Sequence, residues 1–496
     1  LTYFKDDTLA KDSKLIRIKK LSFVKQEELI RNWKSIGRTE ISDTEIDILE
    51  EKINTIISQN QIVPRYPFYI LSILQSLEAF MPNDYKITAY GHCYQALITA
   101  QLLKKNIKSD EIDSCFNYLS NLAFNYFNNG SNSFKEDEHF KSFNIEYKSN
   151  YIINESILNK LKNSEYPILR IKENSVRFEH PYLYYFFLGK YLAEKSEQTI
   201  ISDLCKNIFL KENSYIIIFT VHHAQTQSII DEVILHSLTT FDKIEPAKLL
   251  KTETDFMGNL ITELPIKILS DKTTEENRKI ERNYKEMTKE PEEDTFKGNP
   301  ILEELHKALK LMEVLGQIAK NRAGSFPKPK IKEIIIETQE LGLRVLNFLL
   351  DDMKSDDFRN WLTQKLELKN NEDKLNQTSK IQFIEKTIRF FAFVITASLI
   401  DKIADCIGSE KLLEIVNEIK SENQYPAYEL INMKVKIKHN DINIKNLKKI
   451  KSDFQSNNNK WAIQAMSYNI QSYMNTHKID QNLRQQLIQL LQLGSK

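Results

Sequence analysis

One histidine has the surroundings of an anion-binding residue. His180 follows Val176 and Phe178, which alternate with charged residues as in a half-buried strand. It precedes Pro181, and proline is well tolerated in the first turn of a helix. The sequence therefore predicts His180 at a strand-to-helix junction, beside a helix N-terminus with unpaired N–H groups. Such a corner suits an anionic group such as a phosphate. The alternative is a core histidine with its own partners on a buried hairpin.

Other catalytic or metal-binding patterns are missing from the sequence. None of the 11 glycines has the partner glycine and the following Lys-Ser/Thr of a phosphate-binding loop, so nucleotide chemistry has to come mainly from sequence upstream of Leu1. Adjacent histidines such as His222 and His223 cannot share one helix face for a metal, and we interpret them as structural. The four cysteines lack metal-ligand spacing and lie among apolar residues: Cys93, Cys115, Cys205 and Cys406. We predict no catalytic residue and no metal site in this chain.

The elements around His180 follow from hydrophobic periodicity. Tyr184, Phe187, Leu188, Tyr191 and Leu192 recur at helical spacing and predict an amphipathic helix after Pro181. A hairpin is predicted over 168–178, with its turn at 172–175. Upstream, the periodicity predicts helices over 87–103, 110–127 and 151–162, with a shorter one near 135–147. This order fits a winged helix, whose hairpin would be the wing.

The motif around His180 resembles a known one. Phe178, His180, the pair Tyr185-Phe186, Gly189 and the run 191–193 are similar to the histidine motif in the winged-helix domain of STAND NTPases, the NACHT-type signalling ATPases of animal innate immunity and bacterial antiphage defence. The resemblance implies that His180 contacts the β-phosphate of bound ADP and helps to hold a closed resting state.

The resemblance as a whole covers residues 15–195, and its second part is a proline. In the family, a helix-opening proline packs on the adenine ring, which implies that role for Pro67 in Tyr66-Pro67-Phe68. The alternative is an ordinary first-turn helix proline. One departure is that no arginine precedes Arg17, although related ATPases place an arginine sensor on a strand like the one that opens this chain.

The expected fold class is mainly α, with the end of an α/β NTPase core, a small helical domain, a winged helix with a short β-hairpin, and an irregular helical array. Capping signals and proline positions support helices from Phe23 onward, with a capping box at Ser42 and Glu45. The charged, apolar-poor run Asp271–Gly298 is typical of a linker or exposed disordered loop. The expected domains are the end of the NTPase core (1–22), a helical lid (23–86), the winged helix (87–195), a helical domain (196–269), the charged linker (270–299) and a sensor-like helical domain (300–496).

The composition and the start of the chain limit where the protein acts and what it binds. The chain opens with Leu1 inside an expected strand, so we expect it to be the C-terminal part of a longer polypeptide. The longest strongly apolar block, Phe390–Ile400, has 11 residues and is too short to span a bilayer, so no membrane association is expected. Cysteines without a disulfide pattern fit a cytoplasmic location. The net charge of +1 and the acidic helices before the hairpin make nucleic-acid binding unlikely through this region.

The resemblance implies a function. The chain would be the regulatory and ligand-sensing portion of a STAND-type protein switched by ADP and ATP, with Mg²⁺ held in a P-loop core outside this chain. A prokaryotic antiphage role implies a foreign phage protein as trigger, homo-oligomerisation on activation and an upstream effector. The alternative is a nucleotide-independent helical scaffold with a protein-binding winged helix. A P-loop upstream of the chain would exclude the scaffold.

Overall fold

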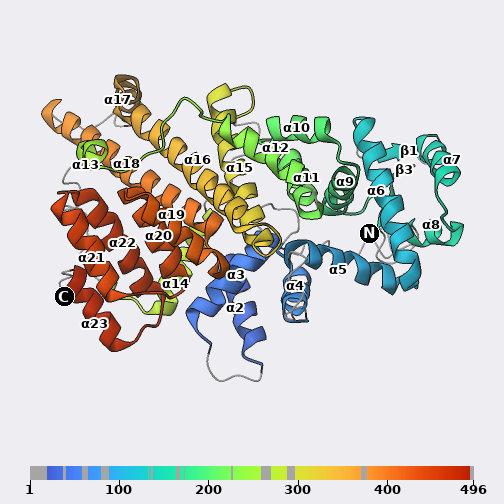
Figure 1. Cartoon of the computed structure of the whole chain (residues 1–496), viewed down its shortest axis with the longest axis horizontal. Helices are drawn as coiled ribbons and strands as arrows, with labels where there is room; N and C mark the ends of the chain where they lie inside the picture. The colour runs from blue at the N-terminus through green and yellow to red at the C-terminus, as the bar shows by residue number, and fades with distance from the viewer. Residues whose placement is uncertain are drawn as a thin grey trace.

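The protein is mainly helical, as the sequence predicts, with one small antiparallel sheet (Figure 1). The sheet lies at one end of an elongated molecule, the C-terminal helices lie at the other, and α2–α4 lie between them (Figure 1). The computed structural model describes residues 19–36, 41–57, 65–79, 89–131, 133–135, 138–162, 168–172, 174–224, 227–257, 270–287, 296–369 and 377–491. The predicted strand at the start of the chain lies outside these residues.

Three helices open the described chain. They are α2 (Phe23–Lys34), α3 (Asp43–Ile57) and α4 (Pro67–Ala79). The predicted cap of α3 is confirmed, because the Glu45 amide donates to Ser42 Oγ at 3.1 Å. Pro67 is the first residue of α4, as predicted. Ile30, Ile46 and Ile70 are fully buried and join the three helices into one core.

The region before residue 196 combines helices with the sheet. Its elements are α5 (Ala89–Lys104), η1 (Ser109–Glu111), α6 (Ile112–Asn128), β1 (Ser133–Lys135), α7 (His139–Asn150), α8 (Glu155–Lys162), β2 (Leu169–Lys172), β3 (Ser175–Phe178) and α9 (Pro181–Lys195). The sheet order is β1-β3-β2, with both pairs antiparallel. The predicted hairpin is confirmed as β2 and β3, and Asn174 in its turn has a φ of 60°.

Two predicted helix bounds in this region are wrong. The helix expected near 135–147 begins only at His139, because Lys135 ends strand β1, which pairs with β3. The helix expected over 151–162 begins at Glu155, because the Tyr151 amide closes α7 on the Tyr147 carbonyl and Asn154 then accepts from the Ser156 amide. Short polar strands and turns carry weak periodicity, and this explains both errors.

Further helices follow α9 and complete the middle of the molecule. They are α10 (Gln198–Lys206), α11 (Lys211–His223), α12 (Gln227–Leu238), α13 (Lys251–Thr254) and η2 (Asp255–Met257). Residues 239–250 carry no helix. Helix α11 is buried along most of its length, with Ile217 and Phe219 fully inaccessible to solvent. It therefore forms a central support on which other helices pack.

The expectation of a linker or exposed disordered loop over 271–298 is wrong for the part described up to residue 287. Helix α14 (Thr274–Met287) forms there, and Arg278 and Arg282 are buried in it. The Thr273 hydroxyl accepts from the Glu276 amide, while the Glu276 carboxylate accepts from the Thr273 amide, so a capping box starts the helix. Composition alone could not reveal the partners that bury these arginines.

The remaining described chain is an irregular helical array, as predicted. Its elements are α15 (Pro300–Arg322), α16 (Lys328–Lys354), α17 (Asp356–Lys369), α18 (Gln377–Ile407), η6 (Glu410–Leu412), α19 (Leu413–Glu422), α20 (Pro426–Lys438), α21 (Ile444–Ser456), α22 (Lys460–Thr476) and α23 (Gln481–Leu491). The apolar block Phe390–Ile400 lies within α18. Among the helices described, none combines the length and apolar character needed to cross a membrane.

Candidate functional site

His180 lies where the sequence predicts, between a strand and a helix. It is the N-cap residue of α9, with φ −126° and ψ 140°, and Pro181 occupies the first helical position. Proline at that position needs no amide partner, which explains why the helix can start abruptly after β3. The His180 side chain makes no capping hydrogen bond to α9. The start of this helix therefore has no side-chain cap from His180.

The hairpin fixes the backbone on which His180 stands. The Glu179 amide donates to the Ile168 carbonyl at 2.8 Å, which ties the residue before His180 to the start of β2. The Glu179 carboxylate forms an ion pair with Arg170 across the hairpin. From α6, the buried Tyr126 hydroxyl donates to the Val176 carbonyl at 2.7 Å. These contacts hold the end of β3 from two sides, β2 and α6.

The imidazole of His180 is half-buried, and its ring lies nearly parallel to that of Tyr182, with centroids 5.7 Å apart. Burial lowers the pKa of His180 below its ordinary value, the Glu179 charge opposes this shift, and Arg170 reinforces it. The ring is therefore neutral at neutral pH, and a neutral imidazole has one N–H donor and one acceptor. It can donate one hydrogen bond to an anion without carrying a charge of its own.

The other residues of the motif hold α9 in place. Gly189 lies so close to α11 that an added Cβ would stand 2.6 Å from Phe219 Cβ and 2.8 Å from the Thr220 nitrogen. Phe186 is fully buried and meets Phe219 edge to face at 5.6 Å. The Tyr185 hydroxyl donates to Glu212 at 3.2 Å. These positions of the motif serve packing, whereas His180 is half-exposed and makes no capping hydrogen bond.

Pro67 lies at the exposed start of α4. Burial raises the pKa of Tyr69 in the same helix, and the charges of Tyr66 and Glu179 add to the shift. Burial is the main cause of the raised pKa of Tyr182, and the charge of Tyr69 adds to it. Residues on either side of Pro67 and of His180 are thus within electrostatic reach of each other. The sequence interpretation did not include Tyr69, although aromatic residues on both sides of Pro67 were a visible signal.

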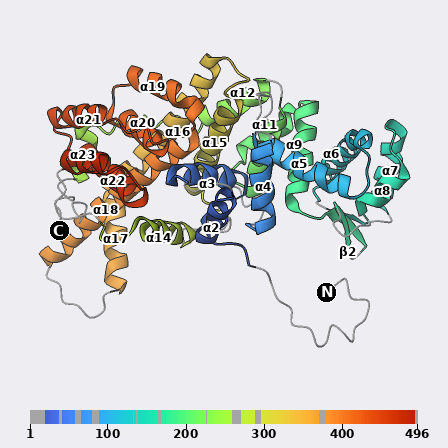
Figure 2. The ribbon, with the colours of Figure 1, turned by 90° about the horizontal axis from the view of Figure 1, so that it is seen from below.

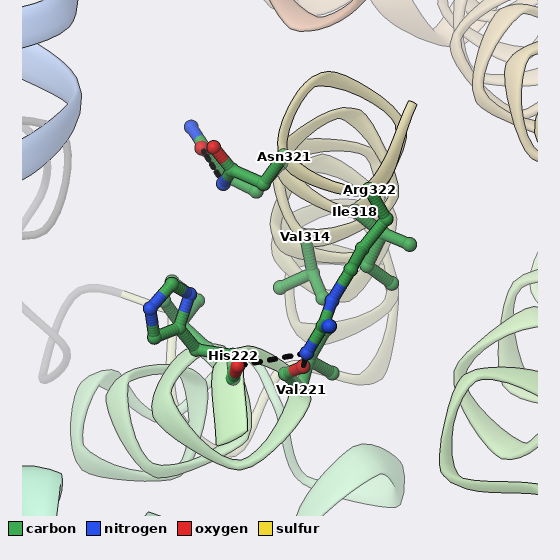
Figure 3. Close-up of a pocket in the computed structure, with 8 residues that line it drawn as sticks. Val221, His222, Val314, Ile318, Asn321 and Arg322 are labelled. Carbon is green, nitrogen blue, oxygen red and sulfur yellow. Dashed lines mark hydrogen bonds between the residues drawn. The ribbon is translucent and has the colours of Figure 1, made fainter. Parts of the chain in front are cut away.

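The two adjacent histidines lie at a different place, on α11. His223 packs edge to face on Phe186 at 4.7 Å, and burial, with Lys190 and Arg322 adding to it, lowers its pKa to about 3. Its neighbour His222 faces α15 beside a cavity of only about 10 Å³ (Figure 3). That volume is at the lower limit for one water molecule, so the cavity is too small for an organic ligand.

Arg322 closes this part of the interface between α11 and α15. Its guanidinium donates to the carbonyls of Val221 at 3.3 Å, His222 at 2.8 Å and Ala224 at 2.6 Å (Figure 3). A cation at the C-terminus of a helix satisfies carbonyls that have no partner within the helix. Within the described part of the chain, no cluster of three or more His, Cys, Asp or Glu side chains is arranged to hold a metal ion.

Comparison of the chain with models of protein families, with curated proteins and with solved structures found no match.

Proposed function

We propose that this chain is the regulatory and ligand-sensing portion of a STAND-type signalling protein, switched by ADP and ATP and acting in prokaryotic antiphage defence. The observation that carries the proposal is His180, which is the N-cap of a proline-started helix and has a half-buried, neutral ring. The surrounding residues follow the spacing of the family's histidine motif, from Phe178 to Ala193.

The order of elements supports a winged helix over residues 87–195. Helix α6 is followed by β1, α7, α8 and the β2–β3 hairpin, and β1 pairs with β3 on the side opposite β2. A winged helix requires a helix, a strand, two further helices and a final hairpin in that order. Its strand and hairpin form one three-stranded sheet. In this assignment the hairpin is the wing, and α9 closes the domain.

The residues at the site fit a phosphate. ADP supplies a diphosphate whose negative charge needs hydrogen-bond donors. His180 would donate its ring N–H, and the N-terminus of α9 would add the favourable end of its helix dipole. The Glu179 carboxylate does not stand as an isolated repelling charge, because Arg170 is paired with it. A hydrogen bond to a charged group is worth about 1.5–3 kcal/mol, enough to bias a switch but too little to hold it alone.

In the proposed mechanism, His180 and Pro67 hold the winged helix against an upstream P-loop core that binds Mg²⁺ and the nucleotide. A phage protein that binds the helical array over 300–496 favours the open state only by its higher affinity for that state. Opening then permits exchange to ATP, homo-oligomerisation and activation of an upstream effector. A cytoplasmic location is proposed as well, and the buried free thiols of Cys115, Cys205 and Cys406 support a reducing compartment.

The test uses the longer polypeptide that contains this chain and its upstream sequence. Purified protein is denatured, and the released nucleotide is quantified for the wild type, for His180→Ala and for His139→Ala. His139 is an exposed histidine at the start of α7 in the same region and serves as the control. We expect ADP in the wild type and the control but a loss of ADP in His180→Ala. The absence of nucleotide from all three proteins would favour the scaffold instead.

A pH series distinguishes a phosphate contact from an indirect effect of the substitution. Phosphate beside His180 favours the protonated imidazole, so binding must raise the lowered pKa of the free site. By linkage, ADP is then held more tightly as the pH falls through the range between the free and bound pKa values. We expect the ADP dissociation rate to fall from pH 8 to pH 6 in the wild type. A wild-type rate with the same pH dependence as His180→Ala would contradict the contact.

A further inference from the structure

Helix α14 is amphipathic in the reverse of the usual sense. Its buried face carries Arg278, which is only 2% exposed to solvent, and Arg282, which is 4% exposed. Its outer face carries Ile280, Tyr284 and Met287, which are 47%, 64% and 80% exposed. A helix on the surface of a globular protein ordinarily buries its apolar side chains and exposes its charges. The attachment of α14 therefore depends mainly on charge.

Arg278 joins three elements that are far apart in sequence. Its guanidinium donates to Glu27 of α2 at 2.8 Å, to Asp47 of α3 at 2.6 Å and to the Thr476 carbonyl at the end of α22 at 3.2 Å. Guanidinium groups suit such a role, because they offer several N–H donors in one plane. This one side chain therefore connects the first described helices with the C-terminal array.

Arg282 extends the same network by one helical turn. It donates to Glu50 at 2.5 Å, and its Nε lies 2.7 Å from the second oxygen of Glu27. Asp47 lies 3.1 Å from the Arg282 guanidinium and also accepts from His477 Nε2 at 2.8 Å. Figure 2 shows α14 at the outer edge of the molecule, between α2 and α18. The network is thus buried beneath a helix that has its other side in solvent.

Without α14, the carboxylates that α2 and α3 contribute to this network outnumber the guanidinium groups by four to one. Glu27, Asp43, Asp47 and Glu50 contribute four carboxylates to the network, while Arg31 pairs with Glu27 and Asp43 from within α2. Arg278 and Arg282 supply two further guanidinium groups. Removing one partner from a buried ion pair leaves an uncompensated charge, which is far more costly than the net worth of the intact pair.

We propose that α14 is an electrostatic latch that fastens the α2–α3 pair to the end of α22 and can detach as a unit. Arg278 and Arg282 hold α14 on both sides of the junction, to Glu27, Asp47 and Glu50 on one side and to the Thr476 carbonyl on the other. Opening the latch therefore removes these contacts, while direct contacts of α3 with the C-terminal array, such as Asp47 with His477 and Glu51 with Lys320, remain. The latch is independent of the nucleotide proposal and goes beyond it.

The test is hydrogen–deuterium exchange on the full chain, comparing the wild type with Arg278→Met and with Lys279→Met. Lys279 is the neighbouring exposed residue, so its substitution removes the same charge from the same helix outside the network. In Arg278→Met we expect exchange to rise roughly a hundredfold in α14 and in the last turn of α22, because one buried partner is lost. Exchange in α9, α11 and α16 should stay as in the wild type, as should the whole profile of Lys279→Met.

Two results would overturn the latch. Exchange in α14 that stays at the wild-type level in Arg278→Met would show that the arginine does not fasten the helix. A loss of protection throughout the chain would show that these arginines belong to a common folding core and not to a detachable junction. A third variant, Ile280→Ser on the outer face, must leave the junction closed. Release of α14 by that variant would also contradict attachment through charge.

Discussion

Replacing Gly189 by alanine tests how α9, and with it His180, is held. The added Cβ would lie 2.6 Å from Phe219 Cβ, 2.8 Å from the Phe219 carbonyl carbon and 2.8 Å from the Thr220 nitrogen. Carbon atoms pack best at about 3.5–4.0 Å, so α9 and α11 must move apart by roughly 1 Å. Two of the three contacts are backbone atoms of a buried helix, which cannot rotate away.

The magnitude follows from two opposing effects. Alanine is favoured over glycine in a helix interior by about 1 kcal/mol. Overpacking in a dense interior costs about 1–3 kcal/mol, and the rigid backbone contacts favour the upper end of this range. We therefore expect Gly189→Ala to destabilise the α9–α11 contact by about 2 kcal/mol, which corresponds to a roughly 30-fold increase in local opening.

Gly342 of α16 provides the matched control. A Cβ there would also meet neighbours closely, at 2.5 Å and 2.7 Å from Ile403 side-chain carbons and 2.9 Å from Met312 Sδ. These are side-chain atoms and not backbone atoms, so the two helices have to move less, and we expect Gly342→Ala to cost less than Gly189→Ala. The assay is hydrogen exchange in peptides covering α9 and α11. Equal or slower exchange in Gly189→Ala would refute the reasoning.

Three further substitutions test contacts around the site. Because His223 is held neutral with a pKa of about 3, the folded state loses stability as the pH falls below the ordinary value of 6.5, by about 1.4 kcal/mol per pH unit. His223→Gln should flatten this loss, which thermal denaturation at pH 7.5 and pH 5.0 would detect. Tyr126→Phe removes the hydrogen bond to the Val176 carbonyl and should cost about 1 kcal/mol, measured as faster exchange of β3 amides. Arg322→Met removes the donors to three carbonyls at the end of α11 and should cost about 2–3 kcal/mol there, with faster exchange confined to its last turn.

Local signals explain most of what the sequence could predict. The strand ending at Phe178, the proline after His180 and the five-residue apolar face of α9 are all encoded within one short stretch. The same holds for the Ser42 cap of α3 and for Pro67 at the start of α4. Each of these features depends on residues a few positions apart, so no tertiary information was needed.

Features that depend on distant partners could not be predicted. The run containing Arg278 has the composition of a solvated loop, and its burial depends on carboxylates more than two hundred residues earlier in the chain. Strand β1 is three residues long and acquires its structure by pairing with β3. The electrostatic effect of Glu179 on Tyr69 likewise joins residues far apart in the sequence and leaves no periodic signal there.

If His180 holds a nucleotide, that nucleotide is released when the proposed longer polypeptide is denatured, and its amount depends on the histidine. We expect ADP in the wild type and in His139→Ala, and its loss in His180→Ala, with all three proteins equally folded by circular dichroism. ADP retained equally by His180→Ala would contradict the role of His180, and the absence of nucleotide from the wild type would contradict the proposed function as a whole.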